Sequence, residues 1–109
     1  MRLTAKALVG ILLETTVVPA ESILLATFGS DFKALPPEIK EICHEKYHRW
    51  RNAPEQVNFE AKHGGWYVVE LTRKWHAVCR VAGSLNGATV YWAHVLDYKS
   101  YSNFLSSKR

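Results

Sequence analysis

Apolar and polar positions alternate with different periods along the chain and predict a series of short elements. The apolar run at 23–28 stops at Gly29 and predicts a buried strand. One capped turn of helix is expected at 30–35. From Pro37 to about Asn52, apolar residues recur every three or four positions. This spacing is typical of an amphipathic helix, and proline is well tolerated in the first turn of a helix.

The second half of the chain is rich in β-branched and aromatic residues. Three runs, at 66–71, 75–81 and 89–95, have the composition of strands. An Asn-Gly turn within 83–87 would join the last two runs as an antiparallel pair. The stretch 100–105 suits either a short helix or an edge strand. Together these elements predict an α+β fold, with a small antiparallel sheet packed against N-terminal helices.

The beginning of the chain has two interpretations. We expect residues 1–22 to be an N-terminal extension and residues 23–109 to be one domain. The extension fits an amphipathic helix capped at Thr4. Basic residues before the apolar run at 7–13, with a small-residue site at 18–20, also resemble a secretory signal, which we consider the weaker interpretation. No stretch is long enough to span a membrane as a helix, so no membrane partner is expected.

Composition supports one compact domain with an unevenly distributed charge. The chain has 109 residues, of which 48% are hydrophobic, and a net charge of +4. Lysine and arginine balance aspartate and glutamate over 1–69, so the whole excess lies in 70–109. A basic half with several aromatic residues suits a polyanion such as nucleic acid or an acidic protein segment. The alternative is a solvated surface with a basic tail.

The two cysteines, Cys43 and Cys79, form neither a disulfide framework nor a C-x-x-C pair. Both occupy positions that are expected to be buried, where a free cysteine acts as a small hydrophobe. A reducing compartment is the simplest interpretation, and we therefore expect the protein to be cytoplasmic.

The segment HEKYH at 44–48 fits the zinc-protease pattern H-E-x-x-H. On a helical wheel His44 and His48 lie roughly 120° and 160° from the centre of the apolar stripe, so both should face solvent. That stripe consists of Ile39, Ile42, Cys43, Tyr47 and Trp50. The extended zinc-protease form also fails, because Arg51 and Pro54 occupy its Gly and His positions. A zinc hydrolase is therefore a distant third hypothesis, and neither a metal site nor a cofactor is expected.

Four segments carry a resemblance to a known family. FKALP at 32–36 precedes the long helix and fits F-x-x-L-P; NFEAK lies at 58–62; GWYVVELTRKWHAV at 65–78 resembles a strand pair; and WAHVLDYKSYSNFL at 92–105 resembles a closing block. In this order and spacing they resemble the RelE/ParE superfamily of bacterial toxins, over roughly residues 23–105. No single segment is specific for the superfamily, but the order and spacing of the four segments together are more specific for it.

The resemblance implies a function as well as a fold. Many members of this superfamily are ribosome-dependent mRNA endonucleases, in which a ribose 2′-OH attacks the adjacent phosphate. That reaction needs a base, an acid and cations that stabilise the charge on the phosphorus. The implied partners are a cognate antitoxin and mRNA on the ribosome.

The resemblance also identifies candidate site residues. His76 and Tyr98 occupy positions where the family usually has arginine and histidine, and Glu70 replaces a strand arginine. The catalytic candidates are His76, Arg80 and Tyr98, with His76 and Tyr98 transferring protons and Arg80 binding phosphate. Lys74, His76 and Arg80 are expected on one side of their strand. The candidate RNA phosphate contacts are Arg73, Lys74 and Lys99.

Two further interpretations remain open. The same fold without nuclease activity would make the chain a binding module, a gyrase-type inhibitor of a protein target, or a decayed toxin. Each candidate also has a purely structural explanation: His76 could be an ordinary sheet histidine. We expect Tyr101 and the tryptophans at 66, 75 and 92 to serve in packing rather than in chemistry.

Overall fold

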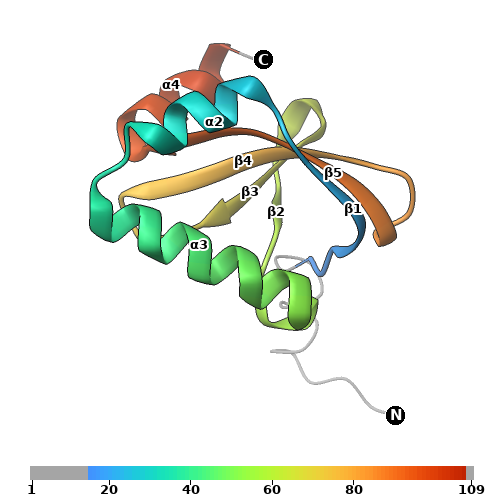
Figure 1. The fold of residues 1–109 in the computed structure, drawn as a ribbon. Coiled ribbons are helices and arrows are strands. Elements are labelled where there is room, and N and C mark those ends of the chain that lie inside the picture. The colour runs from blue at the N-terminus through green and yellow to red at the C-terminus, as the bar shows by residue number, and fades with distance from the viewer. Residues whose placement is uncertain (1–14, 108–109) are drawn as a thin grey trace, which may run out of the picture.

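The computed structural model describes residues 15–107 and shows an α+β fold, as predicted (Figure 1). The named helices and strands, in chain order, are β1 (Val18–Leu24), α2 (Ala26–Lys33), α3 (Pro37–Asn52), β2 (Glu60–Ala61), β3 (Trp66–Glu70), β4 (Trp75–Ala82), β5 (Asn86–Asp97) and α4 (Tyr98–Ser107). Single 3-10 turns at Pro54–Gln56 and His63–Gly65 flank β2. The helix expected near Thr4 lies outside the described residues.

The strands form one five-stranded sheet in the order β1-β5-β4-β3-β2. β1 runs parallel to β5, and the other neighbours are antiparallel, so the predicted antiparallel sheet is confirmed with one parallel edge. The β4–β5 ladder contains a bulge: Val78 pairs with His94 and Cys79 with Trp92, which leaves Ala93 as the extra residue. β5 thus lies between the first strand of the sheet and the β3–β4 hairpin.

The expected buried strand at 23–28 is wrong in two ways. β1 ends at Leu24, which is 56% exposed at the sheet edge, and helix α2 begins at Ala26 instead of a single turn at 30–35. One apolar run supplies both the end of a strand and the start of a helix, and periodicity alone cannot separate them. β1 also begins at Val18, so the expected boundary between residues 22 and 23 falls inside a strand.

The later elements are closer to the prediction. Helix α3 begins at Pro37 and ends at Asn52, and the three expected strands all form. The turn between β4 and β5 is shorter than predicted, because the Asn86-Gly87 pair already belongs to β5 and only 83–85 reverse the chain. Gly83 has a φ of +82°, which favours glycine there. The C-terminal stretch is a helix, α4.

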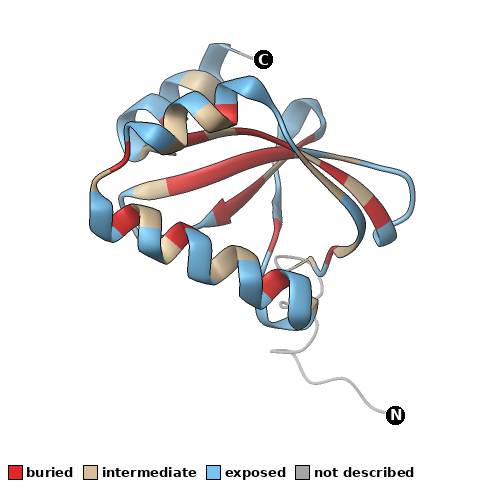
Figure 2. Ribbon diagram, viewed as in Figure 1, coloured by how far each residue is buried: buried red, intermediate tan, exposed pale blue. Residues whose placement is uncertain are grey.

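The sheet has two covered faces with different contents (Figure 2). Helices α2 and α3 cover one face over a large apolar core, whose aromatic members include Phe28, Trp50, Phe59 and Trp92. The wheel prediction is confirmed there, because Ile39, Cys43 and Trp50 of α3 are buried. Helix α4 covers part of the other face over a smaller cluster: Trp66, Val68, Val78, Ala93 and Tyr101. We call these the α2/α3 face and the α4 face.

Both cysteines are buried, as expected, and neither forms a disulfide. Cys43 belongs to the α2/α3 core, and burial raises the pKa of its thiol to about 11. Cys79 on β4 is fully buried, and burial raises the pKa of its thiol even further. Both groups therefore stay protonated and serve as packing residues.

Candidate functional site

The α4 face holds the one buried charged or polar residue of the described chain, His76 on β4, which is 7% exposed. Side chains alternate along a strand, so Ala77 and Cys79 enter the α2/α3 core and His76 points to the opposite face. Helix α4 follows β5 directly and lays two tyrosines over the imidazole. The ring of Tyr101 stacks on His76 at 4.4 Å with an interplanar angle of 11°, and the Tyr98 ring lies 6.1 Å away.

Burial disfavours the charged form of His76. Burial lowers its pKa below the ordinary value of 6.5, and the carboxylates of Glu70 and Glu60 oppose that shift. Its Nε2 lies 3.9 Å from Oε1 of Glu70, which is too far for a hydrogen bond. Its Nδ1 is buried and has no hydrogen-bond partner among residues 15–107. A neutral imidazole with a carboxylate nearby is a group that can accept a proton.

The short edge strand β2 brings a second charged pair to this cluster. Lys62, just after β2, donates to Oε1 of Glu60 at 2.7 Å. Burial raises the pKa of Tyr101, while the nearby ammonium of Lys62 acts in the opposite direction. Neither Glu60 nor Lys62 was predicted from the sequence as a site residue. The segment Glu60-Ala61-Lys62 has no apolar pattern, and only its pairing with β3 shows that it lies beside His76.

Arg80 shares the α4 face with His76, as predicted, but is held elsewhere. Four residues separate the two along β4, which corresponds to about 13 Å. The guanidinium of Arg80 lies 3.9 Å from the centroid of the Trp66 ring and donates to the Gly64 carbonyl at 2.9 Å. The structure therefore places Arg80 in a cation–π contact at the far end of the strand and not beside His76.

The predicted position of Lys74 is wrong, because β4 begins at Trp75 and Lys74 lies in the preceding turn. There its backbone N–H donates to the hydroxyl of Thr72. Lys74 and Lys99 both lie near Asp97, whose pKa is lowered first by hydrogen bonds from Ser100 and then by these two ammonium groups.

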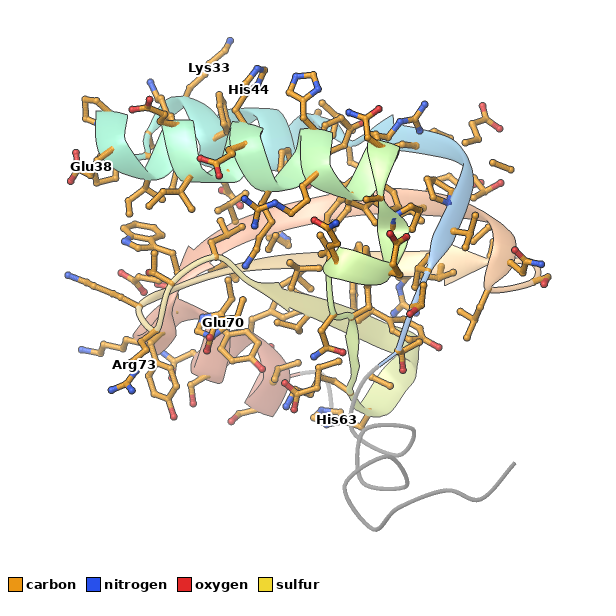
Figure 3. The ribbon with its side chains drawn as sticks, turned by 90° about the horizontal axis from the view of Figure 1, so that it is seen from below. Lys33, Glu38, His44, His63, Glu70 and Arg73 are labelled. Carbon is orange, nitrogen blue, oxygen red and sulfur yellow. The ribbon has the colours of Figure 1, made fainter. Side chains whose placement is uncertain are left out.

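The cationic candidates thus gather at one end of the sheet, around the start of α4. Arg73 and Lys74 are exposed in the β3–β4 turn. Figure 3 shows Arg73 and Glu70 near α4, on the side of the sheet away from α3. Tyr98, at the first position of α4 and directly before Lys99, is 60% exposed, and its ring lies 6.1 Å from that of His76. The structure therefore groups five of the six candidate residues and leaves out Arg80.

The histidines of HEKYH lie on the opposite side of the molecule. His44 and His48 are exposed on α3, as the wheel predicted, and Figure 3 shows His44 on the outer side of that helix. Within residues 15–107, no group of three or more His, Cys, Asp or Glu side chains could hold a metal ion. A zinc hydrolase would need such a third ligand. Among the described helices, none has the length and apolarity to cross a membrane.

Comparison with known proteins identifies the fold. No family model matches the sequence, and no curated protein matches it either. The structure is similar to that of the RelB–RelE antitoxin–toxin complex from Methanococcus jannaschii, with a TM-score of 0.58 and 17% identity over 75% of this chain and 96% of that one. It is also similar to the YoeB/ParE toxin from Agrobacterium tumefaciens, with a TM-score of 0.52 and 12% identity over 72% of this chain and 98% of that one. The chain thus has the RelE/ParE-type toxin fold, and the resemblance seen in the sequence is confirmed at the level of fold.

Proposed function

We propose that this chain is the toxin of a toxin–antitoxin pair and that it cleaves mRNA on the ribosome. The observation that carries the proposal is the His76 cluster, in which a neutral imidazole, a tyrosine hydroxyl and a carboxylate meet on the α4 face of a RelE/ParE-type sheet. A cationic end lies next to that cluster. Proton-transfer groups beside cations are what attack of a ribose 2′-OH on phosphate requires.

In the proposed reaction His76 takes the proton from the 2′-OH. The 2′-oxygen forms a bond to phosphorus, and the bond from phosphorus to the 5′-oxygen of the next nucleotide breaks. The exposed hydroxyl of Tyr98 gives a proton to that leaving oxygen. The products are a 2′,3′-cyclic phosphate and a 5′-hydroxyl end. Lys74, Lys99 and Arg73 bind the RNA backbone, which is the usual role of lysine and arginine at phosphates.

Access to His76 sets a condition on this reaction. The ring of Tyr101 covers the imidazole, so RNA reaches it only when α4 shifts. Rotation of the exposed Tyr98 is fast, but Tyr101 is only 8% exposed, so uncovering the imidazole requires α4 to shift. Binding of a nucleotide base against Tyr98 would provide the stacking energy for such a change.

The proposed protein partner is an antitoxin. One of the structures with the same fold is a complex of a toxin with its antitoxin. The basic excess of 70–109 would attract an acidic partner segment as well as RNA. The proposed location is the cytoplasm, where both translating ribosomes and reduced cysteines are found.

The test is cleavage of a defined mRNA in a purified translation system. The wild type should produce fragments with 2′,3′-cyclic phosphate and 5′-hydroxyl ends. His76→Gln and Tyr98→Phe should each lose at least about 10²-fold in rate, as is usual when a proton-transfer group is removed. His44→Gln is the matched control, because His44 is an exposed histidine on α3. Equal rates for His76→Gln and the control would contradict the proposal.

A second candidate function is a binding module with this fold and no nuclease activity. The burial of His76 under Tyr101 and the engagement of Arg80 by Trp66 favour it, because both side chains are then packing residues. His76→Phe separates the two candidates, since phenylalanine keeps the stacking and removes the base. Growth arrest that persists in His76→Phe, with intact transcripts, would favour the binding module.

A further inference from the structure

We propose that His44 and His48 form a two-histidine site for a divalent transition-metal ion on the outer face of α3. The two residues are four positions apart, so their side chains emerge from the same side of the helix one turn apart. Their Nε2 atoms approach to 3.1 Å, with the rings at 81° to one another. This site is independent of the α4 face, and it does not rest on the proposed function.

The distance between the nitrogens suits a shared ion. Metal–imidazole bonds are about 2.0–2.1 Å long, so two nitrogens on one ion are about 2.9–3.4 Å apart for angles between 90° and 109°. The observed 3.1 Å lies inside that range. Without an ion, one ring donates its Nε2–H to the other Nε2, and this hydrogen bond keeps the two rings close together. The ion binds both Nε2 atoms once the donor ring carries its proton on Nδ1 instead, an exchange through water that needs little movement of the rings.

The neighbouring side chains limit the site to these two ligands. The carboxylate of Glu45, between the histidines in sequence, accepts a hydrogen bond from Arg49 at 2.7 Å. Cys43 precedes His44 in sequence, but its side chain is 7% exposed and packs in the α2/α3 core. The ion would therefore keep water in its remaining positions. Because the Glu45 carboxylate is paired with Arg49, the site binds a metal ion but does not hydrolyse a substrate.

The surroundings leave room for that water. Both histidines line a mainly apolar hollow of about 370 Å³ between α2, α3 and the end of β1. Leu24, Phe28 and Tyr47 form much of its wall. Two imidazoles without thiolates or carboxylates favour Cu²⁺, Ni²⁺ and Zn²⁺ over Mg²⁺ or Ca²⁺, and the usual order of affinities places Cu²⁺ first.

Titration calorimetry of the protein without a histidine tag tests the site, with the metal alone as the probe. We expect one Cu²⁺ per chain, weaker binding of Ni²⁺ and Zn²⁺, and no detectable binding of Mg²⁺. His44→Gln and His48→Gln should each lose saturable binding at concentrations that fill the wild type. The matched control is His63→Gln, an exposed histidine on the other side of the sheet, which should bind as the wild type does (Figure 3).

Thermal unfolding gives a second, independent measurement. An ion that bridges two turns of α3 binds only the folded helix, so it should raise the melting temperature of the wild type and of His63→Gln. It should leave the two single variants unchanged. Circular dichroism establishes that all three variants are folded, which is expected because all three positions are exposed. Equal metal binding by the wild type and by His44→Gln, or no binding by the wild type, would overturn the proposal.

Discussion

The two faces of the sheet differ in the number and the kind of residues that they bury. The α2/α3 face packs large aromatic side chains in mutual contact, and the central Trp50 is 1% exposed. The α4 face has fewer buried residues and includes His76, whose Nδ1 has no partner in the described chain. Burying an unsatisfied polar group costs stability, so natural structures keep few of them. The α2/α3 face therefore supplies most of the folding free energy, and the α4 face accommodates a buried polar group.

The largest expected effect tests where the stability lies. Trp50 contacts the rings of Tyr47, Phe59 and Trp92, and its Nε1–H donates to the Val17 carbonyl at 2.6 Å. Trp50→Ala should therefore lower the free energy of unfolding by about 3–5 kcal/mol, as measured by urea denaturation.

The matched variant on the other face is Trp66→Ala. Trp66 is less fully buried and contacts Phe104 and the Arg80 guanidinium. The same substitution should therefore cost less here, and the protein should stay folded. If both variants lose the same free energy, the α4 face is an equal part of the core, and the proposed division between the faces fails.

A smaller effect is expected where the two faces meet. Oδ2 of Asp31 on α2 accepts hydrogen bonds from Nδ1 of His94 at 2.9 Å and from the Val95 N–H at 3.1 Å, while the His94 ring contacts Phe104 of α4. Asp31→Ala leaves both donors unpaired and should cost about 1–3 kcal/mol. Glu41→Ala, an exposed carboxylate on α3, should change stability by less than about 0.5 kcal/mol in the same assay.

The buried His76 on the α4 face should make the free energy of unfolding depend on pH. Burial lowers the pKa of His76 below 6.5, so the unfolded chain binds its proton more readily than the folded chain does. The wild type should therefore lose stability as the pH falls below 6.5. His76→Phe keeps the stacking on Tyr101 but removes that loss, so its advantage over the wild type should grow from pH 7.5 to pH 5. Parallel stability curves would show that His76 is not the cause.

The smallest effect on stability is expected outside both faces of the sheet. Glu45 and Arg49 form an exposed ion pair at 2.7 Å on the outer side of α3. Glu45→Gln should cost only about 0.3–0.5 kcal/mol, and the difference should vanish in high salt. A larger loss would show that the outer surface of α3 contributes to stability in addition to the two faces of the sheet.

Much of the fold could be predicted because single elements have clear local patterns. Pro37 and the apolar spacing after it define α3, and the strand-like run 66–71 contains β3. Ala26 to Phe28 could not be assigned, because Phe28 is buried equally well by a strand or by a helix. The apolar run alone does not show where the strand stops.

The site was harder to predict than the fold. His76, Tyr98 and the exposed lysines came from the resemblance, and the structure brings them to one end of the sheet. Lys74 was expected on the His76 side by alternation alone, although the predicted strand began at Trp75, and β4 does begin there. The stacking of Tyr101 and the approach of Lys62 depend on how α4 and β2 pack. Such packing between distant segments has no local pattern in the sequence.

The parallel pairing of β1 with β5 has a consequence for synthesis of the protein. β1 leaves the ribosome early, but the strand that must separate it from β4 is made last in the sheet. Loop-closure entropy delays such long-range pairing until both strands are free. A chain stalled before Asn86 thus lacks the strand that joins both faces, and it cannot assemble the His76 cluster. The proposed nuclease would therefore be inactive against the ribosome that is making it until β5 and α4 have emerged.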